Sequence, residues 1–396
     1  MQGSEIVIPT WLWIVFLFAV GGCVGSFLNV VVYRLPRDKS LVAPPSSCPA
    51  CGRGIRFYDN IPLISWLLLA GKCRYCKARI SPRYLVIELL TALVFVGMFV
   101  LYFRCGLRNG VPPFLAGGWF LYLISLILLS ALIVASAIDL ELWVIPLSVC
   151  WFATAAGLVA SALAPLVIHP ATIFHYFLMP TTADLILVNQ TTVASLSAGA
   201  AIGLGVAVLL LTTGLIKRSY DFSRFQSSSE KPEEQNVKEF NDRVEVCREI
   251  IFLLPIVACA LAANWLVNHL AALHQWWLVF SQMPVIAGLL GALAGYFVGC
   301  GIIWMARILG TLAFGREAMG LGDVHLMGAA GAVIGSPFVI VAFFIAPFFG
   351  LAWASVQMFF KKTRQIPYGP FLSLGVLAVM ILHDRIMAYM SIVFYR

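Results

Sequence analysis

The sequence predicts an all-α polytopic membrane protein with about ten transmembrane spans and one small polar domain between its first two spans. Three observations support this fold class. The 396 residues are 61% hydrophobic and only 11% charged, with a mean hydropathy of +0.94, whereas soluble domains are about 25% charged. The apolar residues form long runs, and the basic residues gather between those runs. This composition excludes a soluble enzyme, a disordered scaffold and a small disulfide-stapled secreted domain.

The apolar runs are long enough to cross a membrane, which takes about 20 helical residues. The first run follows a segment without Lys or Arg and precedes Arg34 and Arg37, which predicts an uncleaved anchor with its N-terminus outside. The stretch 324–360 is too long for one crossing and is interrupted at Gly335-Ser336-Pro337, so it predicts two short spans. The other spans are predicted at 11–33, 84–103, 118–138, 143–165, 193–216, 250–272, 284–309 and 370–390.

The net charge of +8 has the distribution of a membrane protein and not of a nucleic-acid-binding protein. Four segments, 34–83, 217–248, 307–316 and 361–364, hold 22 of the 26 Lys and Arg residues. Positively charged loops remain in the cytoplasm, so these segments are predicted to be cytoplasmic. Ten crossings place all four on that side and both termini on the other. Membrane lipid is therefore an expected partner, and nucleic acid is not.

Four cysteines form two CxxC pairs in the first polar segment. Cys48 and Cys51 precede Cys73 and Cys76 at a spacing that is typical of tetrathiolate zinc sites. Four thiolates close a tetrahedral site without an open position, so the predicted zinc is structural and not hydrolytic. The alternatives are four free thiols or a redox pair. The predicted cytoplasmic location argues against disulfides.

Two aspartates lie at the ends of apolar runs, where an acidic side chain is costly and is a functional candidate. Asp139 follows the run 118–138, and Asp323 follows Gly320 and Gly322. The predicted topology places both carboxyl groups on the cytoplasmic side of one bundle. Two adjacent carboxylates that share a proton can perform general acid–base hydrolysis of an amide. The alternative is that each aspartate caps a helix or pairs with an arginine.

Gly320 and Gly322 indicate a special backbone before Asp323. Glycine can adopt positive φ and lets other chains approach closely, and non-helical backbone at membrane depth must be buried in protein or line a wet cavity. We therefore expect a turn that presents Asp323 to a polar cavity. A further acidic residue, Glu88, lies near the start of the span 84–103, where a structural ion pair is expected.

The predicted division of the chain combines these features. The pattern of small residues in 196–218 is similar to that in 286–307, which suggests a duplicated hairpin. The predicted parts are a first span (1–33), a cytoplasmic four-cysteine zinc domain (34–83), spans with the first catalytic aspartate (84–165), an inserted helical hairpin (166–283) with a polar cytoplasmic loop (217–249), and spans with the second catalytic aspartate (284–396).

Six patterns follow one another in a fixed order and cover the N-terminal and C-terminal thirds of the chain. They are Gly25–Val30 with Tyr33–Pro36, Cys48–Cys76 with YDNIPLISWL at 58–67, SPRYLVIELLTA at 81–92, Asp139 with Ile145-Pro146, Gly320-Leu321-Gly322-Asp323, and IPYGPF at 366–371. Together they resemble the bacterial prepilin peptidases, or type IV leader peptidases, which are GxGD-type intramembrane aspartyl proteases.

The resemblance implies an activity at the bacterial inner membrane. The family removes the basic leader from type IV pilin precursors and from the pseudopilin precursors of type II secretion, after a glycine and on the cytoplasmic side. It implies that Asp139 and Asp323 are the catalytic pair. It also implies N-methylation of the new N-terminal residue with S-adenosylmethionine. The sequence contains no independent methyl-donor motif.

Two features depart from the family pattern. Leu147 follows Ile145-Pro146, where the family usually has Asp or Asn, and 193–272 forms a hairpin beyond the usual eight spans. A chain that keeps the fold without the activity is therefore one alternative. An alternative of another class is a membrane transporter whose two aspartates bind a proton or a cation.

Overall fold

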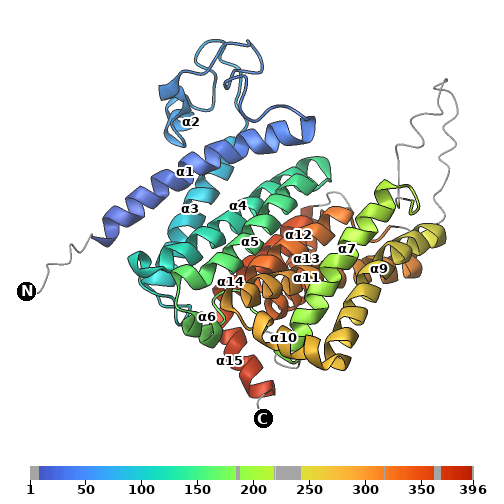
Figure 1. Cartoon of the computed structure of the whole chain (residues 1–396). Coiled ribbons are helices and arrows are strands. Elements are labelled where there is room, and N and C mark those ends of the chain that lie inside the picture. Colours follow the sequence, from blue (N-terminus) through green and yellow to red (C-terminus); the bar gives the residue numbers. More distant parts are fainter. Residues whose placement is uncertain are drawn as a thin grey trace, which may run out of the picture. The chain divides into compact units, whose positions relative to one another are not determined.

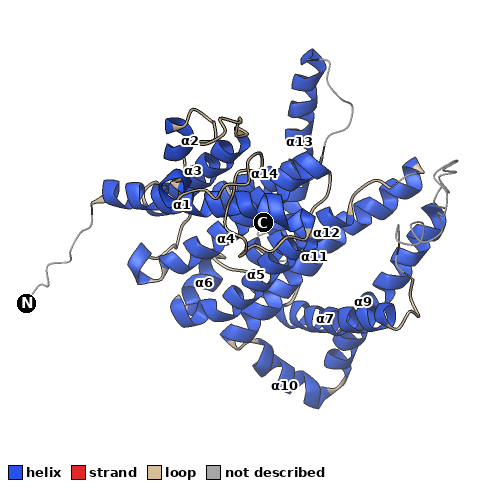
Figure 2. Ribbon diagram, turned by 90° about the horizontal axis from the view of Figure 1, so that it is seen from above, coloured by secondary structure: helices blue, strands red, loops and turns tan. Residues whose placement is uncertain are grey.

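The computed structural model describes residues 9–183, 188–217, 219, 242–315, 317–360 and 367–394. Regular structure in these ranges is helical, and Figure 2 shows helices without strands; two isolated β-bridges occur, Ser47–Gly54 and Lys72–Arg79. The predicted all-α fold class is confirmed. The short 3-10 helices are η1 (Leu35–Arg37), η2 (Phe57–Asn60) and η3 (Phe114–Ala116). The α-helices are α1 (Thr10–Arg34), α2 (Ile64–Leu68), α3 (Arg83–Phe103), α4 (Gly118–Leu142), α5 (Leu147–Val167), α6 (Pro170–Tyr176), α7 (Gln190–Thr212), α9 (Asp242–His269), α10 (Ala271–Ser281), α11 (Pro284–Phe314), α12 (Leu321–Ile334), α13 (Ser336–Phe360), α14 (Gly369–Ile381) and α15 (His383–Phe394).

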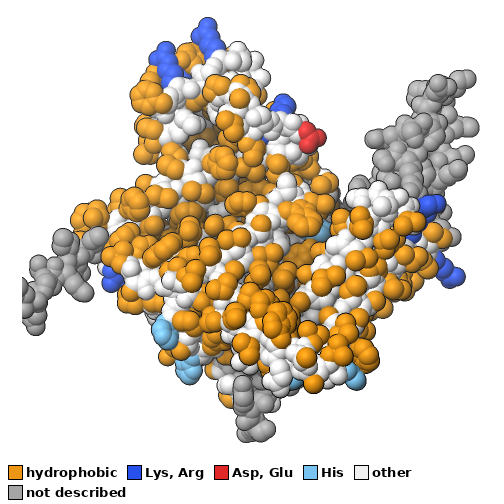
Figure 3. Space-filling view, in the orientation of Figure 1, with side chains coloured by type: hydrophobic (Ala, Val, Ile, Leu, Met, Phe, Trp, Pro, Cys, Tyr) orange, Lys and Arg blue, Asp and Glu red, His pale blue; other side chains and the backbone are white. Residues whose placement is uncertain are grey.

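Eight of the described helices are long and apolar enough to cross a membrane, and α14 with α15 would make a ninth span that is bent by 76°. Helix α12, with 14 residues, is shorter than the roughly 20 that a crossing needs. Each of the ten predicted runs therefore corresponds to a helix or a helix pair. The predicted interruption at Gly335 is confirmed, since this residue has φ of 89° and separates α12 from α13. On the face shown in Figure 3, hydrophobic side chains are spread along the helices, as expected for contact with lipid.

The chain divides into two compact units. The first comprises residues 1–153 and 344–391, and the second comprises 154–343 and 392–396. In the first unit α1 packs along α3, and α4 packs against α14 (Figure 1). Glycine permits the close approach of α1 to α3, because a Cβ atom on Gly25 would lie 2.7 Å from the Cα atom of Glu88. The Asn29 side chain also donates a hydrogen bond of 3.0 Å to the Tyr84 carbonyl on α3.

In the second unit α7 packs along α9, and α11 packs along α12. Both contacts bring helix backbones together: a Cβ atom on Gly203 of α7 would lie 2.5 Å from the Pro255 carbonyl oxygen of α9. On α11, a Cβ atom on Gly295 would lie 2.0 Å from the Gly331 carbonyl oxygen of α12. Most of the predicted loop 217–249, namely 218 and 220–241, lies outside the described residues, as do Arg316 and the basic segment 361–364.

Candidate functional site

The four predicted zinc ligands lie together in the first unit. The ligand atoms of Cys48, Cys51, Cys73 and Cys76 are all within 4.8 Å of one another, and the Cys48 and Cys76 sulfur atoms are 3.8 Å apart. Zinc–thiolate bonds of about 2.3 Å in a tetrahedron place neighbouring sulfur atoms about 3.8 Å apart. The donor set therefore fits a structural zinc ion, and all four cysteines are free thiols and not disulfides.

Two similar turns hold the cysteines. The Cys48 amide donates to the Arg53 carbonyl, and the Cys73 amide donates to the Ala78 carbonyl, both at 2.9 Å. Each turn needs one residue of positive φ; Gly52 supplies it in the first turn, at 70°. Backbone N–H groups of Cys76 and Tyr75 lower the pKa of the Cys73 thiol to about 6, which favours the thiolate that a metal requires.

Asp139 lies in the last turn of α4 and is buried, with 7% of its surface exposed. Its Oδ2 atom accepts a hydrogen bond of 3.0 Å from the backbone N–H of Gly369, the first residue of α14. A second contact lies one turn before Asp139 on α4 and one turn after Gly369 on α14. There the Ser136 hydroxyl donates to the Ser373 hydroxyl, which donates to the Gly369 carbonyl, each at 2.9 Å. The start of α14 thus fixes the Asp139 carboxyl group, and the positive end of that helix faces it.

This contact gives the IPYGPF motif a structural role. Gly369 leaves room for the carboxyl group, because a Cβ atom there would lie 2.7 Å from Asp139 Oδ2 and 3.0 Å from Ile145 Cδ1. Pro370 stands at the start of α14, where its missing N–H is not required. Ile366 lies outside the described residues. The motif therefore includes a hydrogen-bond donor to an acidic side chain as well as a turn ahead of a helix.

Asp323 lies in the first turn of α12 in the second unit and is buried, with 8% of its surface exposed. A carboxylate at a helix N-terminus is stabilised by the helix dipole. The positive φ that glycine allows does not occur at Gly320, because this residue has φ of −72° as the N-cap of α12, and Gly322 already belongs to the helix. Gly320 instead leaves room for the Asp323 side chain, because Asp323 Oδ2 lies 3.5 Å from the position that a Cβ atom on Gly320 would take.

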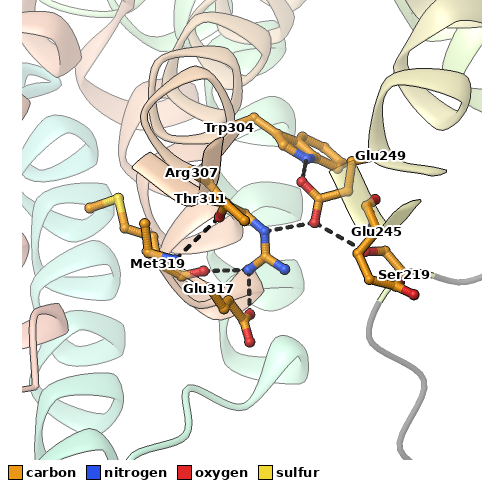
Figure 4. A network of polar contacts seen from close by, with 9 residues as sticks. Ser219, Glu245, Glu249, Trp304, Arg307, Thr311, Glu317 and Met319 are labelled. Atoms are coloured by element: carbon orange, nitrogen blue, oxygen red, sulfur yellow. Dashed lines mark hydrogen bonds and ion pairs between the residues drawn. The ribbon is translucent and has the colours of Figure 1, made fainter. Parts of the chain in front are cut away.

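A buried ionic network holds the backbone before Asp323 (Figure 4). Arg307 of α11 pairs with Glu249 of α9 at 2.8 Å and with Glu317 at 2.7 Å, and it donates to the carbonyl oxygen of Met319. The Trp304 indole also donates to Glu249, at 3.1 Å. Since Met319 precedes Gly320 directly, Arg307 links the ends of two helices to the turn that positions Asp323.

The structure leaves the two aspartates in separate units. Asp139 belongs to the first unit together with the four cysteines, and Asp323 belongs to the second unit with the Arg307 network. Their convergence on one water molecule stays a prediction. Glu88 does not form the predicted ion pair, because no arginine of the described residues lies within ion-pair distance of it. Its carboxylate instead accepts a hydrogen bond of 2.7 Å from the Leu63 amide.

The sequence reasoning missed the Glu249–Arg307 pair. Arg307 was assigned only to a cytoplasmic cluster, yet 3% of its surface is exposed. The signal was available, because both charged residues adjoin or interrupt apolar runs, where an unpaired charge is costly. The sequence does not show which charged residues pair, because Glu249 lies on α9 and Arg307 lies on α11.

Together, the helices and the site define a multi-pass membrane protein with a four-cysteine segment and two buried aspartates at helix ends. A family model described as the bacterial peptidase A24 N-terminal domain matches residues 19–102, and one described as the type IV leader peptidase family matches residues 250–355. Two separate parts of the chain are therefore similar to domains of type IV leader peptidases. The second match begins inside α9, within the segment 166–283 that was predicted to be an insertion.

Several curated proteins are similar to this chain. The prepilin leader peptidase/N-methyltransferase of Myxococcus xanthus (strain DK1622) is 47% identical over 138 residues, which cover 35% of this chain and 37% of that protein. The type 4 prepilin-like proteins leader peptide-processing enzyme of Escherichia coli O78:H11 is 44% identical, with coverage of 32% and 48%. The prepilin leader peptidase/N-methyltransferase of Klebsiella pneumoniae is 42% identical, with coverage of 34% and 56%. The chain thus spans about half or less of the length of these relatives. No solved structure matches it.

Proposed function

We propose that this protein is an intramembrane aspartic peptidase of the bacterial inner membrane that removes the basic leader from type IV pilin and pseudopilin precursors. Cleavage follows a glycine on the cytoplasmic side. The observation that carries the proposal is the placement of Asp139 and Asp323, two buried acids at helix ends in a chain of apolar helices. The names of the relatives support prepilin as the substrate class. The family match favours a peptidase over the ion-coupled transporter.

The proposed reaction needs both carboxyl groups beside one water molecule. One carboxylate accepts a proton from the water as it attacks the scissile carbonyl carbon, and the other carboxyl group donates a proton to the departing amine. The pair must share one proton at the start, because two adjacent carboxylates repel each other when both are ionised. The Gly369 N–H fixes Asp139 for this role, and the Arg307 network fixes the turn before Asp323.

The four-cysteine segment supports the proposed enzyme without taking part in hydrolysis. Zinc held by Cys48, Cys51, Cys73 and Cys76 would bind the two turns together and leave no open coordination position. The proposed second activity is N-methylation of the new N-terminal residue with S-adenosylmethionine. This part rests on the printed names of the relatives, which include N-methyltransferase.

The test is cleavage of a leader-bearing precursor by the full chain in membranes. Asp139→Asn and Asp323→Asn should each abolish cleavage while membrane levels stay unchanged. The matched control is Asp38→Asn, because Asp38 is exposed and has φ of 51°, a conformation that asparagine tolerates. Substantial cleavage by both single variants would refute the catalytic pair. An inactive parent chain, with Leu147 in its natural position, would support the alternative of a fold without activity.

A further inference from the structure

Residues 57–69, called here the tip segment, expose large apolar side chains within the predicted cytoplasmic zinc domain (34–83). Phe57 is 86% exposed, Leu68 81%, Leu67 62% and Ile64 54%. The segment contains η2 and the short helix α2, which lies beside α1 in Figure 1. Contiguous exposed apolar groups of this size mark a surface that contacts a partner or a membrane.

Contacts with α1 and α3 indicate how deep the tip segment lies. The Pro62 side chain packs on α1 beside Gly22, 3.4 Å from the position of a Cβ atom there. Gly22 precedes Arg34 by 12 residues, or about 18 Å along a helix. The Leu63 amide donates to Glu88, which is five residues, or about 8 Å, beyond Arg83 on α3.

Along the helix axes, the first distance exceeds the thickness of the polar layer of a bilayer, and the second is about equal to it. Arg34 and Arg83 mark the basic ends of two spans, where cationic side chains prefer the headgroups. The headgroup layer is roughly 5–8 Å thick on each side of the hydrocarbon core. If α1 and α3 cross the membrane close to its normal, Pro62 and Leu63 would lie at or below the boundary of the hydrocarbon layer.

Several backbone groups of the tip segment have partners within the protein. Irregular backbone in a bilayer must have its polar groups satisfied within the protein. The Leu63 N–H is bonded to Glu88, and the amides of Ser65 and Leu67 donate to the carbonyls of Ile61 and Leu63, at 3.1 and 3.2 Å. The Ser65 hydroxyl donates to the Tyr58 carbonyl at 3.0 Å. Glu88 thus supplies an acceptor for the Leu63 amide from within the protein.

Charged side chains border the tip segment on one side. Arg56 and Arg74 lie over the Tyr58 ring, with guanidinium carbons 5.7 and 5.5 Å from its centre, and Arg74 also pairs with Asp59. Tyrosine with adjacent arginines is typical of the headgroup level, and arginines attract anionic lipids. The tip segment therefore combines exposed apolar side chains with adjacent cationic ones.

We propose that the tip segment enters the membrane, with Ile64, Leu67 and Leu68 among the lipid acyl chains and Arg56 and Arg74 at anionic headgroups. This inference is independent of the proposed peptidase activity. It means that the four-cysteine segment rests on the bilayer at a fixed height and does not stand free in the cytoplasm.

The test is carbene labelling of the full chain in nanodiscs that contain an anionic phospholipid with a diazirine in its acyl chain. Mass spectrometry should find adducts on Leu67 and Leu68 as readily as on Phe27, a half-exposed side chain of α1. Val42 is the matched control, because it is apolar and 92% exposed but lies outside the tip segment. We expect about tenfold less adduct on Val42, given the depth of the acyl chains.

Two outcomes would overturn the proposal: adducts on Phe27 without adducts in residues 57–69, or equal labelling of Val42 and Leu68. A pair of variants sharpens the test. Leu68→Glu should draw the tip segment out of the hydrocarbon and reduce labelling of Ile64 and Leu67. Val42→Glu should leave their labelling unchanged, and an equal reduction by both variants would also contradict the proposal.

Discussion

The contact between Gly369 and Asp139 allows a precise test of how the first aspartate is held. Gly369→Ala adds one methyl group at the start of α14. Gly369 has no positive φ, so alanine causes no backbone strain there. The N–H donor also remains in the backbone. The effect of the substitution is therefore purely steric and acts on the Asp139 carboxyl group.

The size of the effect follows from the distances around Gly369. The new Cβ atom would lie 2.7 Å from Asp139 Oδ2 and 3.0 Å from Ile145 Cδ1, well inside van der Waals separation. Asp139 is buried and must move, or α14 must shift, by roughly 1 Å, and a misplacement of about 1 Å can reduce catalysis about 100-fold. We therefore expect cleavage to fall about 100-fold, which corresponds to about 2.7 kcal/mol of transition-state stabilisation.

The assay is single-turnover cleavage of a prepilin-type precursor by the full chain in membranes, with protein level and zinc content measured in parallel. The matched control is Gly350→Ala in the same unit, where a Cβ atom would meet the Phe371 ring at an ordinary 3.7 Å. This variant should keep the parent rate. Cleavage by Gly369→Ala within about twofold of the parent rate would show that this contact does not position a catalytic group.

Three further predictions concern the polar groups around the site. Arg307→Met should destabilise the protein by about 3–5 kcal/mol, because Glu249 keeps an uncompensated buried charge. Thermal unfolding in detergent measures this loss of stability. A double variant with Glu249→Gln that recovers no stability would contradict the pairing. Zinc binding at pH 7.5 should release fewer than four protons, since the lowered pKa of Cys73, about 6, leaves that thiol already ionised. Calorimetry in buffers of different ionisation enthalpy counts the protons, and release of all four would refute the low pKa. The affinity for zinc should fall more steeply with decreasing pH below about 6, where Cys73 also takes up a proton. Glu88→Ala should destabilise the tip segment by about 1–3 kcal/mol, because the Leu63 amide loses its acceptor. Hydrogen exchange of the tip segment should become faster. Glu88→Gln should restore most of the protection, because its side-chain oxygen can accept the same hydrogen bond.

The sequence predicted the features that local pattern encodes. Hydropathy located the ten helical runs, and the CxxC spacing identified four cysteines that do converge. The bend between α14 and α15 was not predictable, because a hydropathy run carries no information about an angle at Leu382.

Long-range contacts were not predictable for a different reason. The bond from Gly369 to Asp139 joins residues 230 positions apart, and the Arg307–Glu249 pair joins residues 58 positions apart. Neither partner has a local pattern that identifies the other. Of the two properties that glycine offers before Asp323, the structure uses the space beside Gly320 and not the capacity for positive φ.

The backbone contact between α11 and α12 has a consequence for how a substrate could enter. Gly295 and Gly331 touch through their main chains, and Gly299 meets Met327 in the same way one turn along. At these two contacts no side chain lies between the helices to repack, so neither helix can slide or tilt without the other. We therefore expect Asp323 to keep its position relative to α11, and any opening of the bundle to separate helices other than α11 and α12.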